Sequence, residues 1–270
     1  MQALDRDRYE RVRPLFTGLR YNLVVDSILD GHTPAWVYAD DAEAPRTAWL
    51  WNRMDAMLLA GHAGDRAVNR SLAALIRDRV IPDARRRHIP ALSLHYHPDA
   101  WQAQAGVILE GLQPEQAPRR YYRFDRLRVD WRPRLPSGAE MRAIDEELLA
   151  GSHLHNVESV AGWVLSFWAT PADFVRAGLG RCLLRGDEIL SWCLTVYASG
   201  RHRELGVATV PAHRGRGLAT LAAAACVERC LEQGFTPHWH CWEENTASIA
   251  LAGKLGFVDP IQYEVFRFAL

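Results

Sequence analysis

A glycine-rich segment in the C-terminal part of the chain has the residue types needed to bind a phosphate group. It follows an alternating stretch that begins at Glu204, and it leads directly into a long alanine-rich stretch. Gly215 and Gly217 have no Cβ, so their backbone N–H groups can approach a ligand closely. The start of the following helix adds unpaired N–H donors and the positive end of a helix dipole. Arg214 and Arg216 add charged donors. The pattern predicts a phosphate-binding site at a helix start.

Two other nucleotide-binding loops share part of this pattern but lack essential residues here. Gly215-x-Gly217 begins a dinucleotide-binding G-x-G-x-x-G, but the third glycine position holds Thr220. Pro237 and His238 occupy the region where that fold needs an acidic residue. A Walker phosphate loop needs G-K-[ST], which the chain lacks. A plain tight turn remains the simplest alternative, although such a turn rarely needs two glycines, two arginines and an open helix start.

The loop resembles the signature of a known family. Arg214-x-x-Gly217-x-Ala219 is similar to the Q/R-x-x-G-x-G/A of the GNAT N-acetyltransferases, which bind acetyl-CoA through its pyrophosphate at this turn. The resemblance implies that acetyl-CoA is the co-substrate, with no metal. It implies cofactor contacts from the preceding strand (Val207, Ala208, Thr209), the loop (Arg214, Gly215, Arg216, Gly217), the helix start (Leu218, Ala219, Thr220) and Asn245.

A second element of the same family follows at the expected separation. A short strand over 238–242 precedes Asn245, and the next helix closes on Gly256-Phe257, which resembles N-x-x-A-x-x-x-Y-x-x-x-G-F. The resemblance covers about residues 139–270. A further domain, about half of the chain, precedes this region. In this respect the chain is similar to the two-domain branch of the family, which includes an antibiotic-resistance acetyltransferase. Asn245 also suits a helix N-cap, which alone would explain it.

Amide formation from a thioester requires a base, because an alkyl amine is mostly protonated at pH 7. Glu204 is the candidate, since some branches of the family carry a glutamate near this point of the strand. The alternative is a solvated acid that pairs with Arg201 or Arg203. The general acid is missing, because Ala252 stands where the family often has a tyrosine. Ser248 is one turn earlier, but a helical serine more often bonds to the backbone.

Two further groups of residues have types that could form sites. A zinc site is disfavoured, because alternation along a strand separates the histidines from Cys241, and buried thiols explain the cysteines. The arginine- and aromatic-rich segment 119–134 has features of nucleic-acid binding, but a solvated edge strand fits better. The zinc candidates are Cys226, Cys230, His238, His240 and Cys241. Trp163, Trp168, Trp192, Trp239 and Trp242 are candidates for the wall of an acceptor pocket.

The secondary-structure elements that position these residues follow the same order in both halves of the chain. Two helices come first, then three strands, and then a helix, a strand, a helix and a final strand. In the C-terminal half we expect helices over 141–149, 157–177 (broken at Pro171), 218–231 and 246–255, and strands over 179–184, 189–197, 204–210, 238–242 and 262–269. In the N-terminal half we expect helices over 7–16, 22–29, 65–79 and 100–109, and strands over 35–39, 48–52, 57–60, 91–95 and 121–127.

The repeated order predicts an α/β protein with mixed sheets, built from two domains. A segment with two prolines, a serine and a glycine over 131–138 is the expected linker. It separates an N-terminal α/β domain, 1–130, from the acetyltransferase domain, 139–270. We expect the first domain to be a degenerate copy of the second. Asp65 begins its helix where the phosphate loop would stand, and a carboxylate there would occupy the place of the anion.

Composition limits the remaining choices. Of 270 residues, 49% are hydrophobic and 24% charged, which is typical of a globular protein. The 32 basic and 32 acidic residues cancel, so no overall charge attracts nucleic acid or a membrane. Neither a membrane span nor a secretory signal is visible, and five cysteines without framework spacing read as reduced thiols in a cytoplasm. The sequence leaves the acceptor amine, the oligomeric state (a homodimer included) and any ligand of the N-terminal half undetermined.

The expected function is acetyl transfer from acetyl-CoA to a primary amine of a small molecule, by direct attack on the thioester. A catalytically silent acyl-CoA-binding or regulatory module is the alternative, favoured by the missing tyrosine.

Overall fold

The structure is a computed structural model that describes residues 1–270, and the chain divides into two compact units. Unit 1 consists of Met1–Arg119 together with Tyr263–Leu270, and unit 2 consists of Arg120–Gln262. The two units are therefore not consecutive halves of the sequence. The C-terminal end of the chain belongs to unit 1.

These boundaries differ from the expected ones in two respects. The segment 131–138, expected as a linker, lies within unit 2. The expected acetyltransferase domain at 139–270 loses its last residues to unit 1 and gains the segment from Arg120 onward. The difference arises because two long strands, β6 (Glu115–Phe124) and β12 (Phe257–Ala269), each contribute residues to both units.

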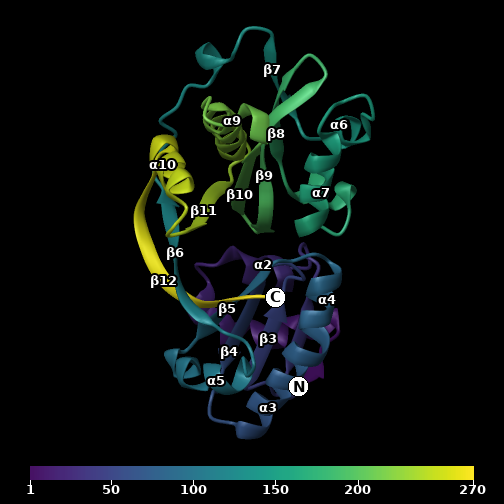
Figure 1. The fold of residues 1–270 in the computed structure, drawn as a ribbon, viewed down its shortest axis with the longest axis vertical. Coiled ribbons are helices and arrows are strands. Elements are labelled where there is room, and N and C mark those ends of the chain that lie inside the picture. Colours follow the sequence, from purple (N-terminus) through teal and green to yellow (C-terminus); the bar gives the residue numbers. More distant parts are fainter. The chain divides into compact units, whose positions relative to one another are not determined.

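Unit 2 contains a mixed sheet in which β10 and β11 run parallel (Figure 1). The strands from β7 to β10 are antiparallel to their neighbours, and β11 runs parallel to β10. In spatial order the strands are β7 (Ala139–Ala143), β8 (Gly180–Arg185), β9 (Glu188–Ser199), β10 (His202–Thr209), β11 (Thr236–Trp242) and the end of β6.

Helices cover both faces of this sheet. α9 (Leu218–Glu232) and α10 (Thr246–Leu255) share a buried core with Leu205, Trp239 and Cys241. On the other face, α7 (Val157–Phe167) places Trp163 over Gly206 of β10. Successive residues of a strand point to opposite faces, so Glu204 and Gly206 lie on the α7 side. The short helices α6 (Glu146–Ala150) and α8 (Pro171–Ala177) flank α7 in the chain.

Unit 1 repeats the strand order of unit 2. An edge strand is followed by an antiparallel meander, a parallel strand and a closing strand from the other end of the chain. The order is β1 (Gln2–Ala3), β2 (Trp36–Ala39), β3 (Thr47–Trp51), β4 (Ala56–Gly61), β5 (Ala91–His97) and the end of β12. The helices are α1 (Tyr9–Val12), α2 (Leu23–Leu29), α3 (Arg66–Leu75), α4 (Ile81–Arg86) and α5 (Ala105–Ile108), with 3₁₀ turns between several of them.

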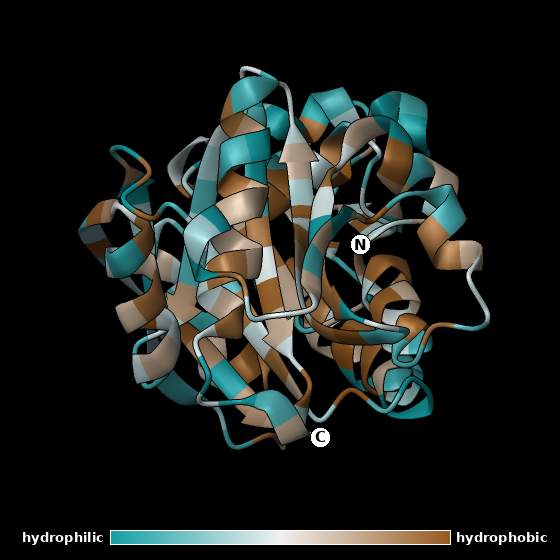
Figure 2. Ribbon diagram, turned by 90° about the horizontal axis from the view of Figure 1, so that it is seen from above, coloured by the Kyte–Doolittle hydropathy of each residue, from teal (hydrophilic) through white to brown (hydrophobic).

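The repeated order confirms the α/β fold class and the expected repetition of one fold in both halves. The apolar strands form the centre of each unit, and the helices carry hydrophilic stretches (Figure 2). Most expected elements are present, and the break at Pro171 separates α7 from α8. No helix combines the length and apolar character that crossing a membrane requires.

One expected element is wrong, and its counterpart in unit 1 was missed. The stretch 141–149 was expected to be a helix, but it begins in strand β7, and only Glu146–Ala150 is helical. Asp145 separates the two, because its side chain accepts a hydrogen bond from Leu148 N and caps α6. The two-residue strand β1 occupies the equivalent edge of unit 1.

Candidate functional site

The parallel strands β10 and β11 separate after a short shared stretch. They pair only at His202↔Thr236, Arg203↔Pro237 and Glu204↔His238. Beyond Glu204, β10 remains paired with β9 as far as Thr209, while β11 continues to Trp242 beside β6 without pairing with β10. The backbone of β10 after Glu204 therefore has a strand partner on one side only. The other side is open to hydrogen bonds from an extended ligand.

The expected cofactor residues of β10 lie along this open stretch. Val207 packs into the core shared with α9, and Ala208 is half-buried. The Thr209 hydroxyl is already engaged, because it is hydrogen-bonded to Ser191 Oγ at 2.9 Å. Ser191 also donates to the Ala208 carbonyl at 2.7 Å. Any contact that these residues make with a ligand arm would therefore come from the main chain.

The glycine-rich loop connects the end of β10 to α9. Gly215 and Gly217 both have φ of +76°, a left-handed conformation that favours glycine. Gly217 is the N-cap of α9, and it provides no side-chain cap. The N–H groups of Leu218 and Ala219 therefore remain available, as the first N–H groups of a helix are unless a cap binds them. Thr220 N donates back to Gly217 O.

A buried histidine holds this loop, and sequence reasoning missed it. His213 Nε2 donates to Glu188 Oε1 at 2.8 Å, while its Nδ1 accepts a long bond from Arg216 at 3.5 Å. One neutral tautomer of the ring satisfies both bonds. Arg214 Nε donates to Thr209 O at 3.3 Å. Both arginines remain exposed, so their charged groups stay accessible beside the helix start.

Glu204 lies where the two strands separate, and it is 7% exposed. Its Oε2 is 3.9 Å from His240 Nε2, and the side chain of His240 is only 1% exposed. Because its side chain is buried, Glu204 is not the solvated acid of the alternative. Arg201 donates to Gly234 O, and Arg203 donates to the carbonyls of Gly200 and His202.

Several aromatic and imidazole rings surround this carboxylate. The Tyr121 ring lies 4.8 Å from the His240 ring and 5.5 Å from the His238 ring. Burial and the charge of Glu204 raise the pKa of Tyr121. His238 is hydrogen-bonded to His202 at 2.8 Å, and burial lowers the pKa of His238 to about 4, assisted by the nearby His202. Glu204 is therefore a buried acid surrounded by aromatic and imidazole rings.

Helix α10 supplies no acid. Asn245 is the N-cap, and its Oδ1 accepts a hydrogen bond from Ser248 N at 3.0 Å. Ser248 Oγ accepts a bond from Trp239 Nε1 at 3.0 Å, which engages this hydroxyl in the core. Ala252 is completely buried in the same core. The Asn245 cap is therefore observed, and its second expected role beside the cofactor stays a prediction.

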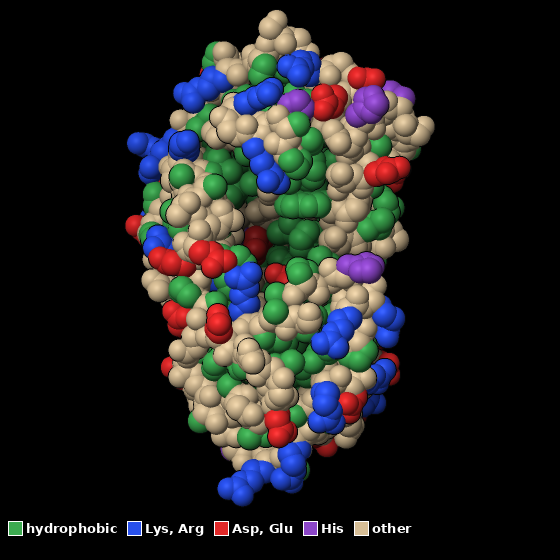
Figure 3. Space-filling view, viewed as in Figure 1, with side chains coloured by type: hydrophobic (Ala, Val, Ile, Leu, Met, Phe, Trp, Pro, Cys, Tyr) green, Lys and Arg blue, Asp and Glu red, His purple; other side chains and the backbone are tan.

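The tryptophans divide between the two faces of the sheet. Trp163 and Trp192 contact each other edge to face, with ring centroids 5.9 Å apart. Trp239 lies in the core with α10, and the indole of Trp168 donates to Thr195 O in the interior. Hydrophobic side chains gather over β8 and β9 in the space-filling view (Figure 3). Trp163 and Trp192 thus lie on the same face as Glu204, and Trp242, two residues after His240 in β11, alternates to that face as well.

The other candidate clusters take structural positions. Cys226, Cys230 and Cys241 lie in the core with α9, opposite the face that carries His238 and His240. Burial raises the pKa of Cys230 to about 12. Four of the seven arginines in the 119–134 segment are engaged in ion pairs: Arg120 with Glu243, Arg123 with Asp259, Arg128 with Asp125 and Arg132 with Glu228.

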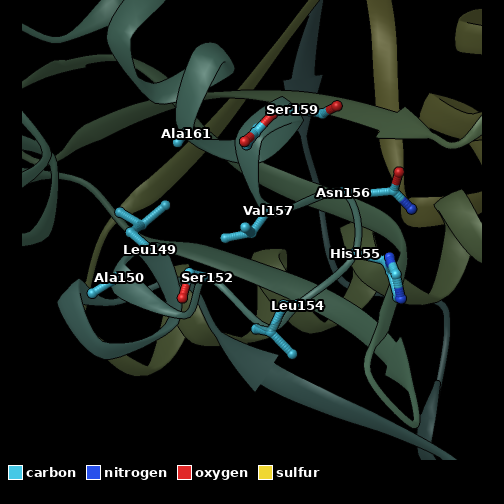
Figure 4. Close-up of a pocket in the computed structure, with 10 residues that line it drawn as sticks. Leu149, Ala150, Ser152, Leu154, His155, Asn156, Val157, Ser159 and Ala161 are labelled. Atoms are coloured by element: carbon cyan, nitrogen blue, oxygen red, sulfur yellow. The ribbon is translucent and has the colours of Figure 1, made fainter.

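A separate depression of about 510 Å³ lies between the end of α6 and the first turns of α7. Its lining includes Leu149 of α6, Leu154 and His155 of the connecting turn, and Val157 at the start of α7 (Figure 4). His155 Nε2 is 3.6 Å from Asp187 Oδ2. None of the expected site residues lines this depression.

Unit 1 has the same strands without the same openings. β4 and β5 stay paired over five residues, from Ala56↔Ser93 to Ala60↔His97, so they do not separate. Asp65 caps α3 by accepting hydrogen bonds from Ala67 N and Val68 N, and these bonds lower the pKa of its carboxyl. A Cβ on Gly61 would lie 2.0 Å from Arg46 O, so this glycine permits close packing of two backbones.

Comparison with known proteins agrees with this geometry. Residues 13–266 match the GNAT acetyltransferase family. An uncharacterized N-acetyltransferase, YdfB of Bacillus subtilis, is 27% identical over 98% of each chain. The solved structure of a GCN5-related N-acetyltransferase-like protein from Streptococcus suis covers 97% of this chain and 98% of its own, with a TM-score of 0.72 at 22% identity.

A second solved structure has the same duplicated architecture. It is a tandem GNAT protein from the clavulanic acid biosynthesis pathway, 15% identical over 99% of this chain and 97% of its own, with a TM-score of 0.60. At this identity the likeness concerns the fold alone. Because the family match extends over both units, the chain as a whole belongs to the GNAT acetyltransferase family.

Proposed function

We propose that the protein transfers an acetyl group from acetyl-CoA to the primary amine of a small molecule by direct attack on the thioester. The proposal is supported above all by the separation of β10 from β11. This separation leaves an open edge of β10 that begins at Glu204 and leads to the uncapped start of α9. A carboxylate, an extended slot and an anion site thus follow one another along a single strand and loop.

The residues present fit acetyl-CoA. The open backbone of Val207, Ala208 and Thr209 would bind the pantetheine arm through main-chain hydrogen bonds. The N–H groups from Gly215 to Ala219 would bind the pyrophosphate, assisted by the exposed charges of Arg214 and Arg216. A Cβ on Gly215 or Gly217 would meet no atom within 4 Å, so the approach to both backbones is unobstructed. Asn245 would lie beside the arm. Acetyl-CoA supplies the activated acyl group.

Glu204 would act as the base. It would accept the proton that an alkylammonium must lose before its nitrogen can attack. Holding the amine and the thioester in line would supply much of the rate enhancement. α10 offers no acid for the thiolate, because Ala252 is buried and Ser248 is engaged with Trp239. Water would therefore protonate the leaving group.

Unit 1 would bind no acetyl-CoA. Its paired β4 and β5 leave no slot, and the Asp65 carboxylate already occupies the N–H groups of α3. The face of β4 that corresponds to the Glu204 face of β10 carries Ala56, Leu58 and Ala60. The residues of β5 opposite them are Ser93, His95 and His97. No acid therefore stands on this face of the pair. Unit 1 would instead complete and stabilise the protein.

A catalytically silent acyl-CoA-binding module is the second candidate, favoured by the buried Ala252. A panel of primary amines with acetyl-CoA, monitored by release of free thiol, separates the two. Thiol release with at least one amine supports the enzyme. Acetyl-CoA binding in calorimetry without thiol release for any amine supports the silent module, and the absence of binding contradicts both.

A further inference from the structure

A second titratable side chain lies beside the proposed base. Glu204 on β10 and His240 on β11 approach to 3.9 Å between Oε2 and Nε2, and the two side chains are 9% and 1% exposed. Both project from the sheet face opposite α9 and α10, because their neighbours Leu205, Trp239 and Cys241 belong to the helix-facing core. A carboxylate buried in this way is costly unless a nearby group can carry the compensating positive charge.

The His240 ring is held by a residue from a distant part of the sequence. Tyr121 lies in the segment of β6 that belongs to unit 2, and its ring centroid is 4.8 Å from that of His240 at 41°. Tyr121 lies close enough to Glu204 for the carboxylate to affect its ionisation. The tyrosine ring therefore restricts how the imidazole can turn beside the acid.

We propose that Glu204 and His240 form a pair that shares the proton taken from the acceptor amine, with Tyr121 as the positioning residue that holds the imidazole. This inference rests on the proposed function. The ammonium N–H bond breaks, and its electron pair stays on the nitrogen that attacks. The proton ends on the His240 imidazole beside the ionised Glu204 and later passes to solvent. The buried pair thereby changes from a net charge of −1 to a neutral ion pair, which burial disfavours far less.

The other titratable groups on this face do not take the same role. His238 is opposite Glu204 in the register, but it is hydrogen-bonded to the exposed His202. Its pKa, lowered to about 4 by burial and by His202, keeps it neutral at physiological pH. Tyr197 lies opposite Glu204 on β9, and Arg123 acts on the Tyr121 hydroxyl. His240 is therefore the imidazole whose protonation responds to Glu204.

Titration of the histidine ring protons by NMR tests the pair without any acceptor. The His240 signal is identified by its loss in His240→Gln. The carboxylate stabilises the imidazolium, so Glu204→Gln should move the midpoint of the His240 titration about one to three pH units lower. Glu140→Gln, an exposed change in β7, is the control and should leave the midpoint in place. An unchanged midpoint in Glu204→Gln overturns the proposal.

Kinetics with an acceptor from the amine panel test the role in turnover. His240→Gln should lower kcat about 10- to 100-fold, abolish the acidic limb of the pH profile and leave the affinity for acetyl-CoA unchanged. The double variant with Glu204→Gln should be no slower than the slower single variant, because the two side chains act as one unit. His238→Gln, on the same strand and under the same tyrosine, should keep kcat within about threefold of the wild type.

Two outcomes separate this inference from the proposed function. If Glu204→Gln keeps full turnover, the proposed base itself is wrong. If Glu204→Gln is slow but His240→Gln is normal, only the shared pair is wrong. For Tyr121, a phenylalanine keeps the ring, so Tyr121→Phe should behave as wild type while Tyr121→Leu should be slow. An equal loss of turnover in Tyr121→Phe and Tyr121→Leu would assign the effect to the tyrosine hydroxyl and overturn the positioning role.

Discussion

Glu204 lies at the last position where β10 still pairs with β11, and its carboxylate is buried. Glu204→Gln keeps the shape of the side chain but removes the proton acceptor. We expect unchanged affinity for acetyl-CoA and a turnover lower by about 10² to 10⁴ at neutral pH. Turnover should recover as the pH rises, because the amine then loses its proton in solution. Steady-state kinetics across pH measure this, and wild-type turnover at neutral pH would assign proton removal to water or to the substrate.

The left-handed φ of Gly217 determines which substitution can test the phosphate loop. A β-branched residue would strain the backbone at +76°, whereas asparagine tolerates this conformation and its Cβ meets open space. Gly217→Asn should therefore fold but obstruct the pyrophosphate, and loss of one charge-assisted bond weakens binding about 10- to 100-fold. Gly138→Asn, at φ +72° and also in open space, is the matched control. Equal affinity for acetyl-CoA in both variants, measured by calorimetry, would contradict the assignment of the loop.

The buried His238 makes stability depend on pH. Its pKa is about 4 in the folded protein, because burial and His202 disfavour the charged form, and about 6.5 in the unfolded chain. The contribution of His238 to the free energy of unfolding is therefore complete above pH 6.5. It is lost as the pH falls toward 4, and the total loss is about 3 kcal/mol. Urea unfolding at pH 7.5 and pH 4.5 should show that the free energy of unfolding decreases less in His238→Gln than in the wild type. The same loss in both would assign the acid sensitivity to other groups.

The site residues differ in how far sequence could predict their contacts. Asn245 and Asp65 cap helices through bonds to residues within three positions, so local pattern was sufficient. The contact of His213 with Glu188 spans 25 residues, and that of His240 with Glu204 joins two strands. Such contacts depend on strand register and on the local separation of β10 from β11. Neither can be read from spacing along one chain.

At the scale of elements, the sheet edges were the least predictable part of the fold. Met141, Ile144 and Leu148 have the three- and four-residue spacing of a helix, yet Met141 lies in strand β7. This strand forms only through pairing with β8, in the register Met141↔Leu183. Strand β1 is two residues long and pairs with Ala39 and Tyr38. The central strands and long helices, by contrast, have strong local patterns and were predicted.

The difference between the two parallel strand pairs gives a prediction about stoichiometry. Because β4 and β5 remain paired while β10 and β11 separate, each chain should bind one acetyl-CoA. Calorimetric titration should give one site per chain, and Gly217→Asn should weaken that single site. Asp65→Ala removes the cap from α3 and serves as the matched change in unit 1, where it should alter stability but not binding. A second site per chain, or binding lost in Asp65→Ala, would show that unit 1 also takes the cofactor.

At the scale of the whole molecule, β6 and β12 each begin in one unit and end in the other. Each unit therefore needs residues from both the N-terminal and the C-terminal part of the chain. A fragment over 139–270 lacks β6, so β11 loses its neighbour in the sheet and Tyr121 is absent. We expect this fragment alone to aggregate or remain unfolded, and coexpression with 1–138 to restore acetyl-CoA binding. The control is the intact chain cut after folding at a protease site beside the exposed Ser137, which should remain folded. Independent folding and binding by 139–270 would contradict the prediction.

The exchange of closing strands also affects how the protein can fold during its synthesis. Unit 1 is formed almost entirely from the first 119 residues, yet its sheet is closed by Tyr263–Leu270, which is synthesised only after all of unit 2. Domains usually fold in the order in which they are translated. Here, the edge of β5 at Leu92 and Leu94 stays unpaired until Phe266 and Phe268 have been synthesised, because these two residues pair with it. Such an edge is prone to intermolecular pairing, so the nascent chain should depend on chaperones until residues 263–270 have left the ribosome.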